Sequence, residues 1–326
     1  MNKDQANPLV SLIVPCYNME LYIERFLLSV LDQTYTKIQF ILVDDGSNDN
    51  SESIIMRYRN KLENKLSEFI YVKQKNGGAA SAVNTALKYV KGKYLTWADS
   101  DDLLLPENVE KKVRYLEKNP QKDLVLCRAI QIDGETEKET GLLERNEPQG
   151  KDTLFEDLMI SGIPCYPGVF MIRTKTLFDI IKDKTIYYNR EVGQNWQLLL
   201  PVAYGNSCGY INDYLYLYYV HNDSHSHNVS LQKQLYRTYA QEEVLKNILN
   251  FIPDGQEKQE IFKKIRIKYS HQRMRLAFKL NDKGLAQKEY KILKIEDKVS
   301  KKEYIYILLL VIPSLKKLIF KIRRKI

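Results

Sequence analysis

The sequence contains few cysteines, and none of them lie close together. Four occur among 326 residues, at widely separated positions: Cys16, Cys127, Cys165 and Cys208. A zinc knuckle needs closely spaced cysteines, and a disulfide scaffold needs many in a short chain, so neither class fits. The pattern is typical of a reducing compartment. Because Met1–Asn7 is polar and unlike a secretory signal, we expect a cytoplasmic location.

Long apolar segments are also absent. The longest apolar run, residues 304–312, has nine residues. A helix that crosses a bilayer needs about 20. We therefore expect no membrane-spanning helix in this sequence.

Excess positive charge is missing from most of the chain. The net charge is 50 − 41 = +9, but residues 285–326 hold 12 basic and 4 acidic residues, which leaves only 9 − 8 = +1 for residues 1–284. A nucleic-acid-binding protein needs a basic face on its folded body. We therefore expect no nucleic-acid partner and seek the partner of the basic tail separately.

Short apolar runs alternate with segments of helical periodicity over the first 133 residues. Such runs suit strands buried on both faces. Repeated strand–helix–strand units predict an α/β fold, with a doubly wound, mostly parallel sheet and helices on both faces. The expected strands are Leu9–Val14, Ile38–Val43, Phe69–Val72, Lys93–Ala98 and Asp123–Ile132.

The later part of the chain has a different pattern. Residues 134–150 are polar and charged, which indicates a loop or a segment that crosses the site. A mixed pattern of helices and strands follows over residues 150–220, and the remainder is lysine-rich and helical. We therefore expect a domain of residues 1–230 and a helical C-terminal region of residues 231–326.

Polar and turn-forming residues follow four of the expected strands. In parallel sheets the carboxyl ends of the strands meet at one edge, and ligands bind there. The four segments are Pro15-Cys16-Tyr17-Asn18, Asp44-Asp45-Gly46-Ser47, Gln74-Lys75-Asn76-Gly77-Gly78 and Asp99-Ser100-Asp101-Asp102. We expect the chemistry of the protein to lie along this edge.

Three aspartates follow the fourth strand. In an extended chain Asp99 and Asp101 point to the same side, with Asp102 opposed. Two converging carboxylates repel each other unless a cation lies between them, and Mg²⁺ and Mn²⁺ prefer oxygen ligands. One interpretation is therefore that Asp99 and Asp101 bind a divalent cation. The alternative is that Asp101 or Asp102 caps the helix ahead of Pro106.

The other three segments each allow two interpretations. The Asp44-Asp45 pair belongs to a glycine turn, or one of its carboxylates accepts hydrogen bonds from a base or a ribose. Tyr17 stacks on a flat ring of a ligand or packs within the protein. Asn76 and Gly77 form a plain loop, or the backbone there approaches a ligand closely.

Taken together, the order and spacing of these motifs resemble those of the family 2 glycosyltransferases, which have the GT-A fold. The resemblance is strong over residues 9–133, the donor half, fainter over residues 150–220, the acceptor half, and absent after residue 230. The matching stretches are Ser11–Asn18, Phe40–Ser47, Asn76–Gly78 with Ala82 and Asn84, and Gly92–Asp102.

The resemblance implies an enzyme that transfers a sugar from a nucleotide diphosphate, with UDP as the expected nucleotide. Asp99 and Asp101 are then expected to hold Mn²⁺ or Mg²⁺, which would stabilise the charge on the leaving diphosphate. The expected nucleotide contacts are Pro15, Tyr17, Asn18, Asp44, Asp45, Asn76, Gly77 and Asp99.

The resemblance also implies an acceptor, a glycan or a lipid-linked glycan in cell-surface polysaccharide synthesis. Direct displacement by an acceptor hydroxyl inverts the anomeric centre. Processive synthases usually carry several membrane spans. Because we expect no membrane-spanning helix in this sequence, a non-processive enzyme is favoured.

One part of the family pattern is missing. Many members carry a Glu-Asp pair at the start of a helix in the second half, and its aspartate acts as the general base. The corresponding residues are Gln194 and Asn195, whose amides cannot accept a proton. Three alternatives follow: Glu191 is the base, Gln194 and Asn195 orient an acceptor that another group deprotonates, or the protein binds the nucleotide sugar without transferring it.

Three histidines follow a further expected strand, the aromatic-rich segment Tyr214–Val220. His221, His225 and His227 are surrounded by small polar residues, so we expect a solvated loop. The alternative is that one of them is a third metal ligand or contacts a phosphate.

The last residues form a basic amphipathic pattern. Residues 314–326 place apolar side chains on one helical face and contain six Lys or Arg and no acid. This is typical of a helix that lies on an anionic membrane surface. We expect residues 304–326 to hold the protein on the inner face of the cell membrane. A core-packed helix with a solvated basic face is the alternative.

Overall fold

The computed structural model describes residues 7–144, 153–161, 166–190, 192, 194–221 and 229–312. The chain divides into two compact units, Met1–Ser224 and His225–Ile326. The first unit contains a sheet flanked by helices, and the described part of the second contains helices alone.

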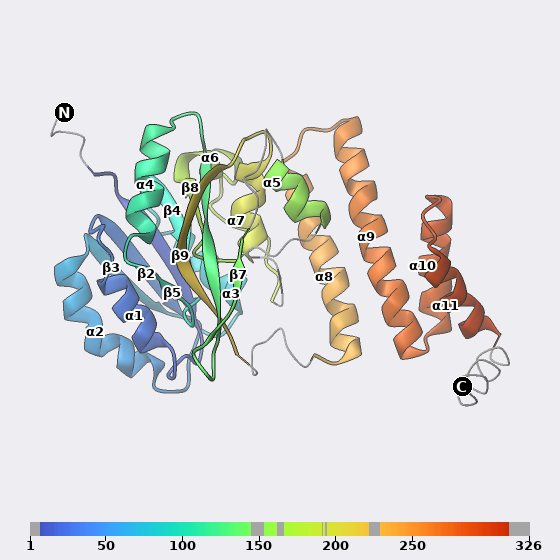
Figure 1. Cartoon of the computed structure of the whole chain (residues 1–326), viewed down its shortest axis with the longest axis horizontal. Helices are drawn as coiled ribbons and strands as arrows, with labels where there is room; N and C mark the ends of the chain where they lie inside the picture. The colour runs from blue at the N-terminus through green and yellow to red at the C-terminus, as the bar shows by residue number, and fades with distance from the viewer. Residues whose placement is uncertain are drawn as a thin grey trace. The chain divides into compact units, whose positions relative to one another are not determined.

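The first unit is built on one mixed sheet with the strand order β3-β2-β1-β4-β8-β6-β9-β5, and β7 pairs with β6 (Figure 1). The first four strands in this order are parallel to one another. They are β1 Val10–Cys16, β2 Ile38–Asp44, β3 Glu68–Lys73 and β4 Tyr94–Trp97.

Apolar composition explains why these segments become central strands. Every residue of β2 and β4 is buried, and in β1 only Pro15 is partly exposed. Strands that are covered on both faces need nearly continuous apolar runs. The predicted strands therefore agree with the observed ones to within two residues at each end.

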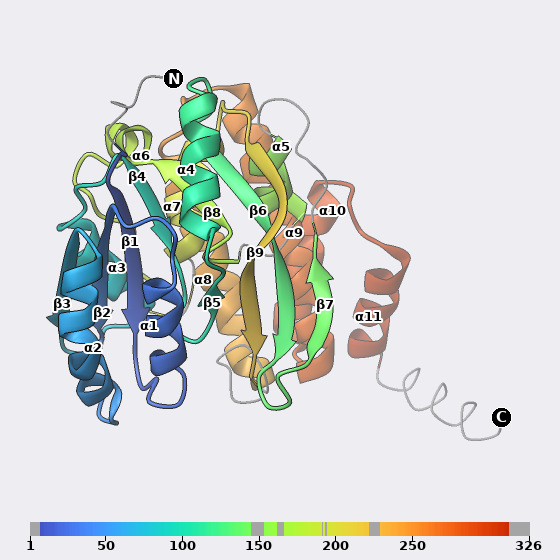
Figure 2. The same cartoon turned by 60° about the vertical axis from the view of Figure 1, so that its left-hand side comes forward.

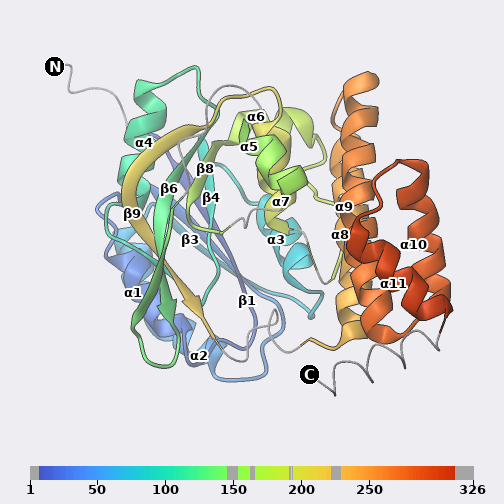
Figure 3. The same cartoon turned by 45° about the vertical axis from the view of Figure 1, so that its right-hand side comes forward.

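Helices cover both faces of the sheet, as predicted. On one face lie α1 Ile23–Leu31, α2 Ser51–Lys65 and α4 Asn108–Lys118; on the other lie α3 Ala79–Leu87, α6 Thr174–Ile180 and α7 Gln194–Ala203 (Figures 2 and 3). Helical spacing turns the apolar side chains of α1 toward the sheet. Its buried apolar residues are Ile23, Phe26, Leu27 and Val30.

The other half of the sheet is partly antiparallel. β8 Phe170–Arg173 runs antiparallel to β4 and to β6 Leu124–Asp133, whereas β9 Gly209–Val220 runs parallel to β6. β5 Leu103–Leu104 pairs with β9 directly after the aspartate loop. This pairing fixes the end of that loop against β9. A short helix, α5 Thr153–Glu156, and a π-helical turn, Asp157–Ser161, precede β8.

Residues 139–143 form a strand where the sequence indicated a polar loop. This strand, β7 Glu139–Leu143, pairs antiparallel with β6. The carboxylate of Asp133 closes the turn between them by accepting hydrogen bonds from the N–H groups of Glu135 and Thr136, at 3.1 and 2.8 Å. No residue of β7 is buried, so no buried apolar pattern marks it in the sequence.

The second unit has four described helices: α8 Leu231–Leu249, α9 Gln256–Leu280, α10 Lys283–Ile295 and α11 Lys301–Val311. Among the helices that the structure describes, none combines the length and the hydropathy that crossing a bilayer requires. One hydrophobic core cluster of this unit is formed by Met274, Ala277, Ala286, Leu293, Ile307 and Leu310.

α11 takes part in this core. Its Ile307 and Leu310 are buried. This part of the predicted membrane-surface segment is therefore a core-packed helix, which was the alternative to a membrane contact. Residues 313–326 of the predicted membrane helix lie outside the described residues. The exposed apolar residues at this end of the unit are Tyr304, Ile305, Val311 and Ile312.

A buried lysine supports the loop that precedes β8. The ammonium of Lys112 donates to Asn108 Oδ1 at 2.8 Å and to the carbonyl of Gly168, which also accepts from Asn108 Nδ2 at 3.1 Å. Gly168 has a φ of +71°, and a Cβ there would lie 2.0 Å from the ring of Tyr216. Only glycine therefore lets Tyr216 pass over this loop.

The buried position of Lys112 should make stability rise with pH. Burial lowers the pKa of Lys112 from 10.5 to about 8. Between these values the unfolded chain binds more protons than the folded chain, so the free energy of unfolding increases with pH. From pH 8 to pH 10 it should increase by about 2 kcal/mol more in the wild type than in Lys112→Met, as measured by denaturant unfolding.

Lys118→Met provides the control, because Lys118 is exposed on the same helix. This variant should follow the wild type at both pH values. A difference between wild type and Lys112→Met that does not change with pH would contradict the prediction.

Candidate functional site

The carboxyl ends of β1, β2, β3 and β4 meet at one edge of the sheet, as the sequence predicts. These strands are parallel, so the segments that follow them lie along the same edge. The strand order reverses at β1: β2 and β3 lie on one side of it and β4 on the other. Ligand sites of open α/β sheets form at such a point.

Hydrogen bonds join the loops after β1 and β2. Asn18 has a left-handed φ of 53°. Its N–H donates to Ser47 Oγ at 3.0 Å, and its side-chain oxygen accepts from the N–H of Asn48 at 3.0 Å. Tyr17 lies beside this junction with 36% of its surface exposed, which leaves its ring accessible to a ligand.

Asp44 holds the loop after β2 in shape. It has no exposed surface, and its carboxylate accepts from the N–H of Ser47 at 2.7 Å and from the hydroxyl of Tyr71 at 2.8 Å. Gly46 has a φ of +80°, and a Cβ there would lie 2.9 Å from the backbone nitrogen of Asn76. The predicted glycine turn is therefore present, and it packs against the next loop.

Asp45 joins the loop after β2 to the loop after β3. One carboxylate oxygen accepts from Gln74 Nε2 at 2.7 Å and from the N–H of Gly77 at 3.0 Å; the other accepts from the N–H of Gly78 at 2.6 Å. The carboxylate thus shapes the backbone at 77–78. Direct nucleotide contact stays a prediction for Asp45, as it does for Pro15, Tyr17, Asn18, Asp44, Asn76 and Gly77.

A segment from the acceptor half lies on the loop after β3. The hydroxyl of Tyr188 donates to the carbonyl of Gly77 at 3.0 Å, and Arg190 donates to Asn76 Oδ1 at 2.9 Å. Gly78 has a φ of +87°, and a Cβ there would lie 2.8 Å from the carbonyl oxygen of Arg190. The backbones of the two halves therefore meet at this point.

The same segment leads into α7. The side-chain amide of Asn84 exchanges hydrogen bonds of 2.7 and 3.0 Å with the backbone of Ile186, and Gln197 of α7 exchanges bonds of 2.7 and 2.9 Å with the backbone of Tyr187. These bonds fix the approach of the chain to the first turn of α7.

Of the two residues predicted to act on the acceptor, the structure describes one. Asn195 is half-buried in the first turn of α7. Glu191 lies outside the described residues. The catalytic roles of both residues stay predictions.

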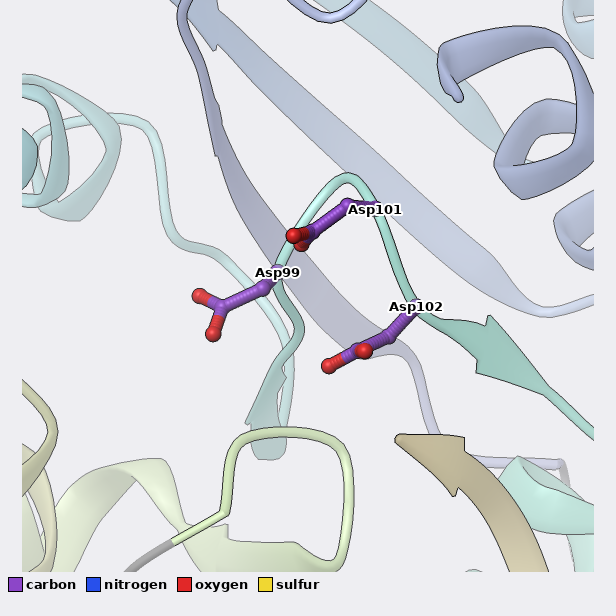
Figure 4. Close-up of side chains that lie close together, drawn as sticks. All are labelled: Asp99, Asp101 and Asp102. Carbon is purple, nitrogen blue, oxygen red and sulfur yellow. The ribbon is translucent and has the colours of Figure 1, made fainter. Parts of the chain in front are cut away.

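Three carboxylates lie together in the loop after β4 (Figure 4). Asp99, Asp101 and Asp102 offer ligand atoms within 4.8 Å of one another. The prediction that Asp102 points away from the other two is wrong, because the chain turns at residues 100–101 instead of remaining extended. The N–H of Asp102 accordingly donates to the carbonyl of Asp99, at 3.4 Å.

Asp102 is anchored to β9. Its buried carboxylate accepts from the hydroxyl of Tyr216 at 2.5 Å and from the N–H of Tyr219 at 2.8 Å. Burial and the charges of Asp101 and Asp99 raise the pKa of Asp102 well above its ordinary value. Both oxygens of Asp102 therefore hold the loop in place rather than cap the following helix, and Asp99 and Asp101 are left as the better cation ligands.

Asp99 and Asp101 have the chemistry of a cation site. Burial and the neighbouring charge of Asp101 raise the pKa of Asp99 to about 7. In the described part of the chain, the Asp99 carboxylate takes part in no hydrogen bond or ion pair. Clustered carboxylate oxygens are the ligands that Mg²⁺ and Mn²⁺ prefer, so the residues present fit a divalent cation.

His221 borders the carboxylates, although the sequence predicts a solvated loop for it. The residue is buried, its ring stacks on Tyr22 at 4.1 Å, and its Nε2 lies 4.0 Å from Asp101 Oδ2. The solvated-loop expectation is therefore wrong for His221, while His225 and His227 lie outside the described residues. The local polar composition carries no signal of this burial.

Arg25 is a further neighbour that the sequence analysis missed. Its Nη2 donates to the backbone carbonyl of Asp101 at 2.6 Å, and its guanidinium lies 3.6 Å from the ring centre of Tyr219. Arg25 therefore braces the turn that carries the carboxylates. In the sequence it is one of 50 lysines and arginines, and nothing in its local pattern distinguishes it.

Comparisons with known proteins agree with this geometry. The family model for glycosyl transferase family 2 matches residues 11–180. The uncharacterized glycosyltransferase RP339 of Rickettsia prowazekii is 37% identical over 126 residues, which cover 39% of this chain and 37% of RP339. The minor teichoic acid biosynthesis protein GgaB of Bacillus subtilis is 25% identical over 298 residues, which cover 89% of this chain and 32% of GgaB. The matched regions thus span only about a third of either relative.

A solved structure has the same fold. The crystal structure of S. aureus TarS 1-349 in complex with UDP-GlcNAc superposes with a TM-score of 0.63 and 22% identity, covering 93% of this chain and 85% of that chain. The predicted GT-A fold with a helical C-terminal region is therefore confirmed. Because the family model covers 170 of the 326 residues, the resemblance is confirmed as well, and the chain belongs to glycosyl transferase family 2.

Proposed function

We propose that the protein transfers a sugar from a nucleotide diphosphate donor, UDP-linked, to a glycan or lipid-linked acceptor in the synthesis of a cell-surface polymer. The observation that carries this proposal is the convergence of Asp99 and Asp101 at the carboxyl end of β4, beside the loops after β1, β2 and β3. The complex of TarS with UDP-GlcNAc supports the donor class, and the role of GgaB in teichoic acid biosynthesis supports the acceptor class.

The first three loops would bind the nucleotide. The exposed ring of Tyr17 offers a stacking surface for the base, with Pro15 and Asn18 on either side of it in the sequence. The backbone at Asn76 and Gly77, held by Asp45, can approach the nucleoside closely because Gly77 has no side chain.

Asp99 and Asp101 would hold Mn²⁺ or Mg²⁺ against the diphosphate. The cation would act there as a Lewis acid that offsets the charge on the leaving group. Asp102 and Arg25 would position the two ligands, since Asp102 holds the loop to β9 and Arg25 donates to the carbonyl of Asp101. His221, close to Asp101, is a candidate third ligand.

Transfer would be a direct, inverting and non-processive displacement. An acceptor hydroxyl attacks the anomeric carbon while the bond from that carbon to the diphosphate oxygen breaks and the nucleoside diphosphate leaves. The proton of the hydroxyl goes to a base on the acceptor side. Glu191 is our proposed base, since it directly follows Arg190, which is bonded to the donor loop. Asn195 would orient the acceptor through its amide.

One observation favours a second candidate function. Gln194 and Asn195 stand where many family members carry the acidic pair, so the protein would bind a nucleotide sugar without transferring it. Turnover of UDP-sugars with a polymer acceptor separates the two functions: donor binding without product would favour this second one.

We also propose that the basic tail holds the protein on the inner face of the membrane. Residues 314–326 carry six positive charges and no acid, and each contributes roughly 1 kcal/mol near an anionic surface.

The first prediction concerns the metal ligands. In Asp99→Asn/Asp101→Asn, the increase in melting temperature that Mn²⁺ and UDP together produce in the wild type should vanish, because amides bind divalent cations poorly. Turnover should fall by a factor on the order of 10³. Asp183→Asn, at an exposed acid in the same unit, should behave as the wild type. Intact donor binding and turnover in the double variant would overturn the proposal.

The second prediction concerns the base. Glu191→Gln should lower kcat by a factor of roughly 10² to 10⁴ without weakening UDP binding, because the amide cannot accept the proton. Glu156→Gln, at an exposed glutamate of α5, is the matched control. Full turnover in Glu191→Gln would show that another group is the base.

The third prediction concerns the tail. The deletion of residues 304–326 would remove the core residues Ile307 and Leu310, so a deletion of residues 313–326 isolates the tail more cleanly. The shortened protein should stop sedimenting with vesicles that contain anionic lipid, while the full chain sediments with them but not with neutral vesicles. Unchanged sedimentation after the deletion would rule out the tail as the anchor.

A further inference from the structure

The C-terminal helical unit contains a pocket that the proposed transfer reaction does not use. It has a volume of about 300 Å³ and lies among α8, α9 and α10. All of its lining residues belong to this unit, and none belongs to the sheet or its loops.

Four basic side chains line the pocket, and two of them are paired with the same acid. Glu242 lies 2.5 Å from Arg273 Nη1 and 2.8 Å from Lys246 Nζ. In the part of the chain that the structure describes, no carboxylate pairs with Arg266 or Lys288. These two residues therefore present positive charge that an anionic ligand could neutralise.

A buried carboxylate also lines the pocket. Glu289 has no exposed surface, and its Oε1 lies 3.1 Å from Arg273 Nε. Its Oε2 accepts no hydrogen bond among the described residues. Leaving a buried acceptor unpaired is unfavourable, so a ligand that donates a hydroxyl here would stabilise the site.

Two aromatic side chains complete the lining. Tyr239 and Phe262 are 38% and 39% exposed. Aromatic rings beside a few fixed polar groups are the usual composition of a small-molecule site. Here they offer apolar surface to the C–H face of a sugar ring, next to the cations and the acceptor.

We infer that this pocket binds a carbohydrate that carries a phosphate or a carboxylate. Arg266 and Lys288 bind the anionic group, Glu289 accepts from a sugar hydroxyl, and Tyr239 contacts the ring. The site goes beyond the proposed transfer, because it would hold a second part of an anionic glycan and raise the effective concentration of the acceptor.

Titration calorimetry on the full chain tests this inference. The Asp99→Asn/Asp101→Asn background serves here, so the outcome does not depend on the proposed donor site. The probes are glucose 6-phosphate, glucuronate, glucose and inorganic phosphate. We expect one of the two anionic sugars to bind at least about tenfold more tightly than either glucose or inorganic phosphate. Which of the two binds identifies the anionic group.

Charge-removing variants locate the site. Arg266→Gln/Lys288→Gln should weaken this binding by at least about tenfold. Lys264→Gln/Lys291→Gln, which removes two exposed charges from the same helices outside the pocket, should leave it unchanged. Lys288→Gln alone changes only an exposed side chain, so it weakens binding without disturbing the fold.

Three results would overturn the inference. If neither glucose 6-phosphate nor glucuronate binds, the pocket does not recognise this class of ligand. Inorganic phosphate that binds as tightly as the anionic sugars would reduce the pocket to a simple anion site. Sugar binding that survives both Arg266→Gln/Lys288→Gln and Lys288→Gln would place the ligand elsewhere. A failure of donor binding or turnover in the wild type would contradict the proposed function instead and leave this measurement standing.

Discussion

Repulsion among three carboxylates in one short loop is the constraint on which the candidate site depends. Asp99, Asp101 and Asp102 lie within hydrogen-bonding reach of a common point, and burial raises the pKa of both Asp99 and Asp102. The fold resolves part of this repulsion by giving Asp102 two donors from β9, the hydroxyl of Tyr216 and the N–H of Tyr219. The loop can then present the other two aspartates together.

Much of the surrounding architecture follows from that anchor. β9 must run beside the loop, and the pairing of β5 with β9 keeps it there. Tyr216 reaches Asp102 only because Gly168 leaves room for its ring. The side chains of Lys112 and Asn108 hold this glycine in place by donating hydrogen bonds to its carbonyl. Gly168, which is far from the aspartates in the sequence, therefore contributes to their geometry.

The parallel half of the sheet could be predicted closely because its signal is local. Strands such as β2 are buried on both faces, so apolar runs mark them directly in the sequence. The orientation of Asp102 could not be predicted, because the rule of alternating sides holds for an extended chain and this chain turns. β7 could not be predicted for a different reason: none of its residues is buried, so no buried apolar pattern marks it in the sequence.

The surroundings of the carboxylates were harder to predict than the carboxylates themselves. His221 stands among polar residues that favour a solvated loop, yet Tyr22 from the start of the chain covers its ring. Arg25 reaches Asp101 across 76 positions of sequence. Contacts of this kind depend on tertiary packing, which local composition and hydrophobic periodicity do not specify.

The bonds of Asp102 have a consequence for cation binding at the site. With that carboxylate committed to β9, the protein offers an incoming ion chiefly Asp99 and Asp101, a sparse ligand set that leaves most coordination positions to water and to phosphate oxygens. Under the function proposed above, a cation at Asp99 and Asp101 would need further ligands from water and from the phosphates of the donor. The protein alone would then bind the cation weakly, and the presence of donor would strengthen that binding.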